Sequence, residues 1–383
     1  KMVNFRGYKF LDSLSFLNAG LSKLANNLIG GNPENAPRFH EAFSQKGLTK
    51  DELIRVTRKG VFPYKWFSSV EKLDNLVLPC REEFFNDLSG EECSEEDYAQ
   101  AVWVWEKFKC KTFREYHDLY LEADVLLLAD VFEAFRELCM QQYGLDPCHY
   151  ITLPGMCIDG AVLEAFKTNI KIELIHTDPD KYTFFETGIR GGVSVVTHRY
   201  AKANNPQVDG YDPSKPKSNI LYLDANNLYG WAMMQYLPCG GFEWSDISLD
   251  QVFNGNWESE NGCSVEVDLE YPQELHECHN DLPLAPERVT LGYADASGKA
   301  KSSTTSPGVA CEKLAGHFRP HLNYVCDARL LQYYVAKGLR VTKLHRAMTY
   351  KQAQTLKPWI EKNTTLRSKA VSYTHLRAHE TRH

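Results

Sequence analysis

The chain lacks any run of about 18 or more uncharged apolar residues, and its N-terminus lacks the charged-then-apolar pattern of a signal peptide. These two absences argue against membrane insertion and against secretion. Its eleven cysteines include no C-x-x-C pair, which suits reduced thiols in an intracellular compartment. We therefore expect a folded intracellular protein, and the sequence leaves nuclear and cytoplasmic placement equally open.

A metal-binding box is also lacking. His276, Cys278 and His279 put three potential ligands within four residues, but no second half with zinc-ligand spacing follows them. We interpret this stretch as a polar loop.

Length and charge distribution are more informative. A chain of 383 residues with 43% hydrophobic and 12% aromatic content has enough apolar material for two or three domains. The net charge of -7 does not suggest nucleic acid, yet residues 337–370 carry nine basic side chains and one acidic one. Such a segment, with Lys343 and Arg346 at its centre, is a candidate contact for a polyanion. A solvated basic helix surface is the alternative.

Hydrophobic periodicity divides the chain near residue 176. Before it we expect a strand at Tyr8–Leu11, a helix over residues 14–28 with a glycine stop, a helix near 98–108 and a long helix over 113–144. After it the pattern changes to short strands and turns, with candidate strands in residues 188–200, 218–230 and 263–272. Residues 290–306 are polar and rich in small residues, which is typical of an exposed loop.

In the long helix, Asp124 falls within the apolar stripe, whereas Glu122 and Asp130 are expected to point the other way. A buried carboxylate is costly unless it is paired, hydrogen-bonded or bound to a metal. Tyr120 lies one turn earlier on the same face, where it could hold a water or a phosphate beside the aspartate. A structural carboxylate that caps or salt-bridges a neighbouring segment is the alternative.

Asp224 follows the apolar run 220–223. A strand over this run places the carboxylate at its carboxyl end, where carboxylates hold Mg²⁺ and the backbone amides that follow can receive a triphosphate. Asp-Ala-Asn-Asn is also ordinary turn chemistry, so a plain turn remains the alternative.

Several stretches resemble motifs of one enzyme family. "YLDANNLYGWAM", residues 222–233, resembles the first polymerase motif of family-B DNA polymerases, Asp-x-x-Ser-Leu-Tyr-Pro. "YLEADVLLLADVF", residues 120–132, resembles their third exonuclease motif, Tyr-x-x-x-Asp, and the two occur in the required order. "IRGG", residues 189–192, "DSLSFL" and "KGVF" are similar to elements of the protein-primed branch. The surrounding amino-acid sequence resembles the DNA polymerases of Maverick/Polinton transposons and related viruses over most of residues 1–370.

The resemblance implies a role for each matching residue. Asp224 and Asp124 match metal ligands of the polymerase and exonuclease sites, Tyr120 a residue that orients the attacking water, and Lys59 a supporting cation. The remaining matches imply nucleotide contacts at Tyr229, Ala225, Asn227 and Leu228, and contacts to DNA or a terminal protein at Ser13, Leu14, Gly191 and Gly192. Asn227, Gly230 and Ile189 depart from the family's Ser, Pro and Tyr. The loss of the tyrosine at position 189 weakens the single-strand assignment there.

The resemblance also implies an internal fragment. The chain contains no Asp-Thr-Asp, no Lys-x-x-x-Asn-Ser-x-Tyr-Gly and no early Asp-x-Glu exonuclease motif. We expect a fold of mixed α/β and α+β class, in which residues 1–175 are the later part of an RNase H-like 3′–5′ exonuclease. Residues 176–370 would be the first part of a polymerase palm with some of the terminal-protein insertion, and residues 371–383 resemble an adaptor-derived tail.

The intact parent would use Mg²⁺, dNTPs, primer-template and single-stranded DNA, and in the protein-primed branch a terminal protein. The expected activity is DNA-directed DNA polymerisation with proofreading in that parent, and none in this chain alone. A non-catalytic nucleic-acid-binding protein or an inactive transposon remnant is the alternative.

Overall fold

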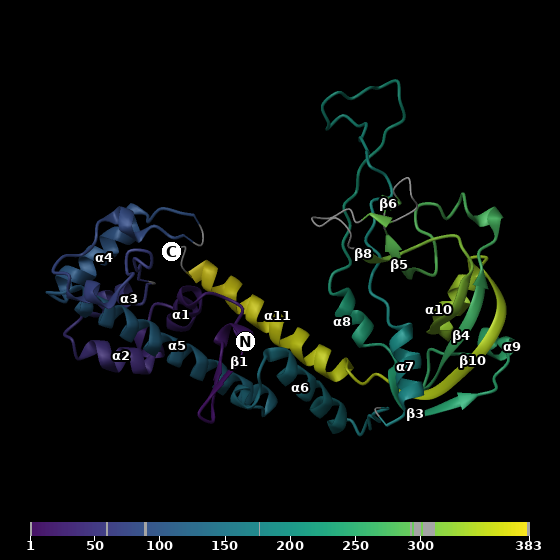
Figure 1. The fold of residues 1–383 in the computed structure, drawn as a ribbon, viewed down its shortest axis with the longest axis horizontal. Helices are drawn as coiled ribbons and strands as arrows, with labels where there is room; N and C mark the ends of the chain where they lie inside the picture. Colours follow the sequence, from purple (N-terminus) through teal and green to yellow (C-terminus); the bar gives the residue numbers. More distant parts are fainter. Residues whose placement is uncertain are drawn as a thin grey trace. The chain divides into compact units, whose positions relative to one another are not determined.

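The computed structural model describes residues 2–58, 60–87, 90–175, 177–291, 293–294, 300–301 and 311–380. The chain forms two compact units, Lys1–Gly160 and Ala161–His383 (Figure 1). The first is mainly helical and the second is built on an antiparallel sheet, so the expected mixed fold class is confirmed. None of the helices among the described residues is long and apolar enough to cross a membrane.

The first unit packs its helices around one long helix. It begins with the hairpin of β1 (Met2–Phe5) and β2 (Tyr8–Leu11), whose turn residues Arg6 and Gly7 both have positive φ. The helices that follow are α1 (Leu21–Ile29), α2 (Pro37–Ser44), α3 (Lys50–Val56), α4 (Glu95–Lys107) and α5 (Phe113–Tyr143). Short 3₁₀ turns connect them at Ser13–Ser15, Pro33–Asn35, Val70–Asp74, Arg81–Phe84 and Pro147–His149.

Two apolar clusters share α5. One packs α1, α2 and α3 against Ala123, Leu127 and Val131 of α5. The other packs residues 61–84 and α4 against Phe113 and Tyr116 at the start of α5. The strand, the glycine stop and the long helix expected from the sequence are confirmed. The helix expected over 14–28 is shorter, because Gly20 takes the N-cap position and α1 starts after it.

The second unit contains a four-stranded antiparallel sheet in the order β3-β10-β4-β9. Its strands are β3 (Leu237–Ser245), β4 (Asn261–Glu270), β9 (His321–Asp327) and β10 (Arg340–Ala353). Smaller pairs are β5 (Glu287–Leu291) with β8 (Cys311–Ala315), and β6 (Tyr293–Ala294) with β7 (Ala300–Lys301). The helices are α7 (Pro179–Gly188), α8 (Leu228–Met233), α9 (Leu249–Asn254), α10 (Ala328–Ala336) and α11 (Lys357–Glu380), and a 3₁₀ turn occupies Gln273–Leu275. Helix α6 (Leu153–Lys167) contains the residues at which the chain divides into the two units, Gly160 and Ala161.

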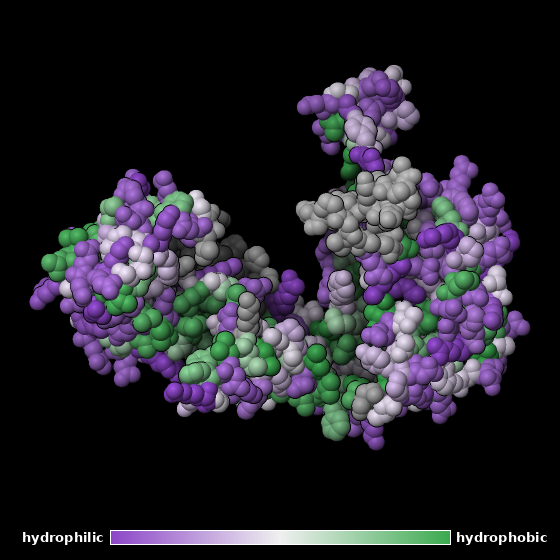
Figure 2. Space-filling model, viewed as in Figure 1, coloured by the Kyte–Doolittle hydropathy of each residue, from purple (hydrophilic) through white to green (hydrophobic). Residues whose placement is uncertain are grey.

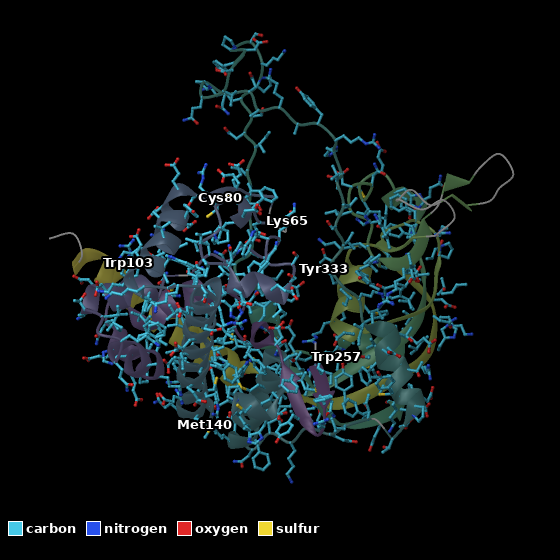
Figure 3. All side chains as sticks on the ribbon, turned by 60° about the vertical axis from the view of Figure 1, so that its left-hand side comes forward. Lys65, Cys80, Trp103, Met140, Trp257 and Tyr333 are labelled. Atoms are coloured by element: carbon cyan, nitrogen blue, oxygen red, sulfur yellow. The ribbon has the colours of Figure 1, made fainter. Side chains whose placement is uncertain are left out.

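Both faces of this sheet are covered. Tyr324 and Cys326 of β9 belong to the larger cluster with α9 and α10, whereas Val325 between them belongs to a cluster with Phe184 of α7. Successive side chains of a strand point to opposite faces, so the two clusters lie on opposite sides of the sheet. Trp257, labelled in Figure 3, packs against the larger cluster.

Two expected strands are absent from the structure. Residues 189–227 contain no helix or strand; Asn204 and Ser218 hydrogen-bond through their backbones and close a loop whose tip is mainly hydrophilic in Figure 2. Of the strands expected after residue 176, the one in residues 263–272 forms, as part of β4. Residues 290–306 lie largely outside the described residues.

Candidate functional site

The residues that the sequence singles out occur in both units. Tyr120 and Asp124 lie on α5 of the first unit, as the Tyr-x-x-x-Asp spacing predicts for one helix face. Asp224, Tyr229 and the other nucleotide-contact candidates lie in the second unit. Lys59 lies outside the described residues.

Tyr120 and Asp124 lie together at a small internal pocket. Both residues line a cavity of about 40 Å³, together with Arg58 and Gly60. The hydroxyl of Tyr120 lies 2.9 Å from that of Tyr64. Burial raises the pKa of Tyr120, and the Tyr64 hydrogen bond and the neighbouring Asp124 carboxylate raise this pKa further. Tyr120 therefore stays protonated at neutral pH and can donate a hydrogen bond.

Tyr120 also borders a larger pocket of about 380 Å³. Two cationic side chains, Arg58 and Lys65, line this pocket; Lys65 is labelled in Figure 3. Both cations already face carboxylates, Arg58 with Glu96 at 2.7 Å and Lys65 with Asp87 at 3.2 Å. The pocket can admit a polar ligand beside Tyr120, and its cations have to exchange partners to bind an anion.

The buried face of α5 differs from the predicted one. Asp124 is only partly buried, while Leu121 and Leu128, expected on its apolar stripe, are 49% and 37% exposed. The fully buried carboxylate is Asp130, which was expected to point away from the core. It accepts hydrogen bonds from the backbone amides of Arg38 and Phe39 and from the Arg38 guanidinium. The structural carboxylate on this helix is therefore Asp130.

Asp224 lies on an exposed segment rather than at the end of a strand. Residues 220–223 form no strand, and Tyr222 is 95% exposed. The turn that follows has Asn227 in the left-handed region, φ 54°, where asparagine is tolerated, and its carbonyl accepts from Trp231 to begin α8. Tyr229, in the first turn of α8, is 84% exposed. Ala225, Asn227 and Leu228 thus surround a turn that presents the carboxylate to solvent.

The candidate DNA contacts of the first and second units are exposed backbone elements. Ser13 and Leu14 form a 3₁₀ turn, in which the Leu14 amide donates to Asp12, and the Leu14 side chain is 56% exposed. Gly191 and Gly192 have open space where a Cβ would stand. Nothing within 4 Å of either position requires glycine, and the contact of Gly191 and Gly192 with DNA or a terminal protein remains a prediction.

The first part of the basic segment, on β10, faces carboxylates from the neighbouring strand. On β10, Arg340, Lys343 and Arg346 stand opposite the acidic residues of β4, in the pairs Arg340↔Glu270, Lys343↔Asp268 and Arg346↔Glu266. Arg346 bonds to Glu266 and, at 3.0 Å, to Asp180, and its guanidinium lies 4.7 Å from the centre of the Trp244 ring. This pairing weakens the interpretation of the segment as a free polyanion-binding face.

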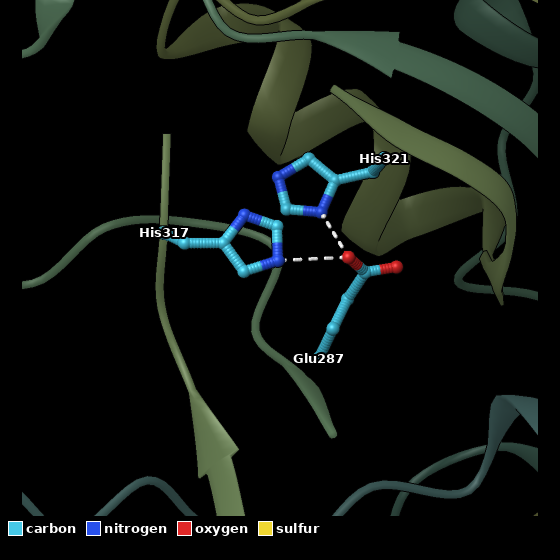
Figure 4. A group of neighbouring side chains, drawn as sticks. All are labelled: Glu287, His317 and His321. Atoms are coloured by element: carbon cyan, nitrogen blue, oxygen red, sulfur yellow. Dashed lines mark hydrogen bonds and ion pairs between the residues drawn. The ribbon is translucent and has the colours of Figure 1, made fainter. Parts of the chain in front are cut away.

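The described residues do not provide a two-metal site around either aspartate. Such a site needs several carboxylates around a pair of ions about 3.5 to 4 Å apart. Only one group of three His, Cys, Asp or Glu side chains with converging ligand atoms occurs in the described part of the chain, and it consists of Glu287, His317 and His321 (Figure 4).

Sequence reasoning missed this group. Its only local signal is the H-x₃-H spacing of "HFRPH", within the range of zinc-binding histidine pairs, and no pattern links it to a glutamate thirty residues earlier. His276, Cys278 and His279 do not form such a group. The ring of His276 stacks on Phe318, and His279 bonds to the Tyr271 hydroxyl at 2.7 Å, as suits a polar loop. The ten cysteines whose side chains are described are free thiols.

Comparison with protein families gives a match over most of the chain. The family model described as DNA polymerase type B, organellar and viral, matches residues 2–297, a span that includes both the Tyr120–Asp124 pair and the Asp224–Tyr229 turn. No curated protein matches the chain. No solved structure matches it.

Proposed function

Because this chain belongs to the type B DNA polymerases of organelles and viruses, we propose that it serves DNA-directed DNA synthesis, with primer-template DNA and dNTPs as its ligands. The observation that carries this proposal is the family match, whose range, residues 2–297, includes both motif segments. The sequence resemblance to Maverick/Polinton polymerases supports a parent polymerase that is primed by a protein and comes from a mobile element or virus. A terminal protein would then be a further partner.

The first 175 residues would contribute to a 3′–5′ exonuclease that proofreads the product. The joint placement of Tyr120 and Asp124 at one pocket supports this assignment. In that role Asp124 binds a metal ion, and Tyr120, kept protonated by burial, orients a water or the scissile phosphate. The family resemblance assigns Lys59, which lies outside the described residues, the role of a supporting cation.

Residues 176–370 would contribute to the polymerase palm. Asp224 offers an accessible carboxylate for Mg²⁺, and Tyr229 would contact the sugar of the incoming nucleotide. Ala225, Asn227 and Leu228 would contact the triphosphate through the backbone of the turn, and Gly191 and Gly192, with Ser13 and Leu14 of the other unit, would contact single-stranded DNA. The alternative, a non-catalytic binding protein that uses Lys343 and Arg346, is not favoured, because carboxylates of β4 face this segment.

Type B DNA polymerases generally use divalent metal ions, yet the described residues do not fit a metal pair at Asp224 or Asp124. One carboxylate binds Mg²⁺ weakly and cannot position two ions. We therefore expect this chain alone to bind primer-template DNA but to show neither Mg²⁺-dependent extension nor 3′-end degradation.

Two assays on the purified chain test the proposal. Fluorescence anisotropy with a labelled primer-template at several salt concentrations measures binding, and gel analysis of the same DNA with Mg²⁺ and dNTPs measures turnover. Failure to bind the DNA at low salt would overturn the proposed function. Turnover that disappears in Asp224→Ala or Asp124→Ala, but persists in the exposed control Asp118→Ala, would overturn the expected inactivity.

A further inference from the structure

A glutamate and two histidines meet where three pieces of the second unit join. Glu287 is the first residue of β5, His317 follows the end of β8, and His321 is the first residue of β9. β5 and β8 pair with Glu287 opposite Ala315, so the strand register places the carboxylate beside the start of the "HFRPH" stretch. The backbone pairing, rather than sequence proximity, assembles the three side chains.

The three ligand atoms have nearly the spacing of a metal site. His317 Nε2 lies 2.9 Å and His321 Nδ1 lies 3.0 Å from the same atom, Glu287 Oε2 (Figure 4). Ligands at the usual Zn²⁺ distances and tetrahedral angles are about 3.3 Å apart. To admit an ion, the carboxylate has to retreat by a few tenths of an ångström and one of the two imidazole rings has to turn. The two imidazole rings are stacked, with centres 4.5 Å apart and planes 13° apart, and this contact fixes their shared orientation.

Hydrogen bonding alone does not satisfy this group. His321 is fully buried, and its Nδ1 lies close to Oε2 without the geometry of a hydrogen bond. His321 Nε2 and His317 Nδ1 also lack partners among the described residues. Buried polar atoms normally have hydrogen-bond partners. Buried atoms without such partners indicate a place for an ion or a water molecule. An ion beside Glu287 Oε2 would give His321 Nδ1 a partner, once one of the two stacked rings turns so that both ring planes reach the ion.

We propose that Glu287, His317 and His321 bind one Zn²⁺ ion, at a site separate from the polymerase and exonuclease motifs. Two imidazole nitrogens and one carboxylate oxygen suit Zn²⁺ better than Mg²⁺, which prefers oxygen ligands. Three protein ligands leave a fourth coordination position.

The open position would face solvent or an anion. Glu287 and His317 both line a pocket of about 950 Å³, whose wall also carries Arg190, Arg288 and Arg319. A water or a small anion such as phosphate can therefore reach the ion from this pocket. The ion would also tie the β5–β8 pair to β9, so binding should stabilise the fold of the second unit.

Metal binding by the full chain tests the proposal. After chelation and dialysis, the chain is titrated with Zn²⁺ alone by calorimetry, and bound metal is counted by elemental analysis. We expect one Zn²⁺ per chain and a higher melting temperature that EDTA reverses. With Co²⁺ as a spectroscopic probe, we expect the visible bands of a four-coordinate site without the near-ultraviolet band of a thiolate ligand, which excludes the cysteines.

Variants assign the ligands. Glu287→Gln and His317→Gln should weaken Zn²⁺ binding at least about tenfold. The matched controls His276→Gln and Cys278→Ser, which remove potential ligands from the nearby polar loop, should bind as the unaltered chain does. His321 is fully buried and its replacement risks misfolding, so the Co²⁺ spectrum of the unaltered chain provides the independent readout. Absence of stoichiometric Zn²⁺ binding, a thiolate band, or equal affinity in Glu287→Gln and His317→Gln would each overturn the proposal.

Discussion

Asp130 shows how one side chain on α5 fixes a neighbouring helix. Helix α2 starts at Pro37, and its N-cap residue, Ala36, has no side chain that can accept a hydrogen bond. The carboxylate of Asp130 supplies the missing acceptor from another helix, binding the amides of Arg38 and Phe39. Negative charge at this position also suits the positive end of the helix dipole. The stability of α2 therefore depends on a residue ninety positions later in the chain.

We predict that Asp130→Ala destabilises the first unit strongly. The change leaves two amides and part of a guanidinium without their buried acceptor, so we expect the free energy of unfolding to fall by about 2–4 kcal/mol. Urea denaturation followed by circular dichroism measures it. Asp118→Ala, which removes an exposed carboxylate from the same helix, serves as control and should cost less than about 0.5 kcal/mol. Similar losses for the two variants would contradict the capping role.

Tyr120, Asp124 and Asp130, all on α5, show what a helical pattern can and cannot predict for single residues. The 100° periodicity placed Tyr120 and Asp124 on one face, and the structure brings them to one pocket. It could not show that Asp130 is buried instead of exposed, because the reason lies in the amides of α2. A polar residue enters the core when another segment supplies its partners, and a single helix does not contain that information.

At the scale of elements, β4 and β10 form a ladder of opposite charges. The count of charged residues along the sequence showed the basic residues of β10 but not their neighbours, because the sheet pairs them with Glu266, Asp268 and Glu270 of β4. Opposite charges on directly facing residues stabilise a strand pair modestly. They also reduce the positive potential that β10 would otherwise present to DNA.

We predict that the double variant Glu266→Gln/Asp268→Asn binds DNA more tightly than the unaltered chain. Loss of the Glu266 carboxylate removes one of the two acids bonded to Arg346, and loss of the Asp268 charge removes the negative charge near Lys343. Both cations then attract phosphate more strongly, which should steepen the dependence of log affinity on log salt by about 1–2. Anisotropy titrations at several salt concentrations measure this slope. Glu41→Gln/Glu137→Gln makes the same change in net charge on the first unit and should change the slope less. If both double variants shift the slope equally, net charge rather than the ladder controls binding.

The predicted strands also differ in outcome for a physical reason. β4 was predictable because alternate residues Val265, Val267 and Leu269 pack into a core that this chain itself provides. Residues 220–223 carry an equally apolar pattern, but a strand needs hydrogen-bonding neighbours as well as hydrophobicity. In the described structure residues 220–223 form no strand and are exposed. The Asp224 motif therefore stays a prediction from sequence resemblance, and the exposed geometry of its residues was not predicted.

At the scale of the whole molecule, many ionisable groups are buried in neutral form. Burial raises the pKa of the Cys263 and Cys326 thiols to about 12, and raises the pKa values of Tyr116, Tyr324 and Tyr350 as well. Cys263 lies on β4 and Cys326 on the adjacent strand β9, and both belong to the larger apolar cluster of the second unit. In the unfolded chain a thiol ionises near pH 8.5 and a phenol near pH 10.

These shifts set the direction of the pH dependence. Above about pH 8.5 the unfolded chain releases protons that the folded chain retains, so the free energy of unfolding falls as pH rises. The stabilising contribution of each group is complete below its unfolded pKa and is lost progressively up to its folded pKa, near pH 12 for the two thiols. Between pH 8.5 and pH 10, each buried thiol should lower the free energy of unfolding by roughly 1–2 kcal/mol.

We predict that the double variant Cys263→Ala/Cys326→Ala flattens this alkaline loss, although its lost packing lowers stability at pH 7. Calorimetric melting between pH 7 and pH 10.5 measures the slope of melting temperature against pH. Cys80→Ala/Cys278→Ala removes two exposed thiols and should keep the slope of the unaltered chain. The comparison of slopes separates proton linkage from packing, because a cavity lowers the melting temperature at every pH, whereas a buried thiol changes its pH dependence. Equal slopes in the two double variants would assign the alkaline loss to the tyrosines.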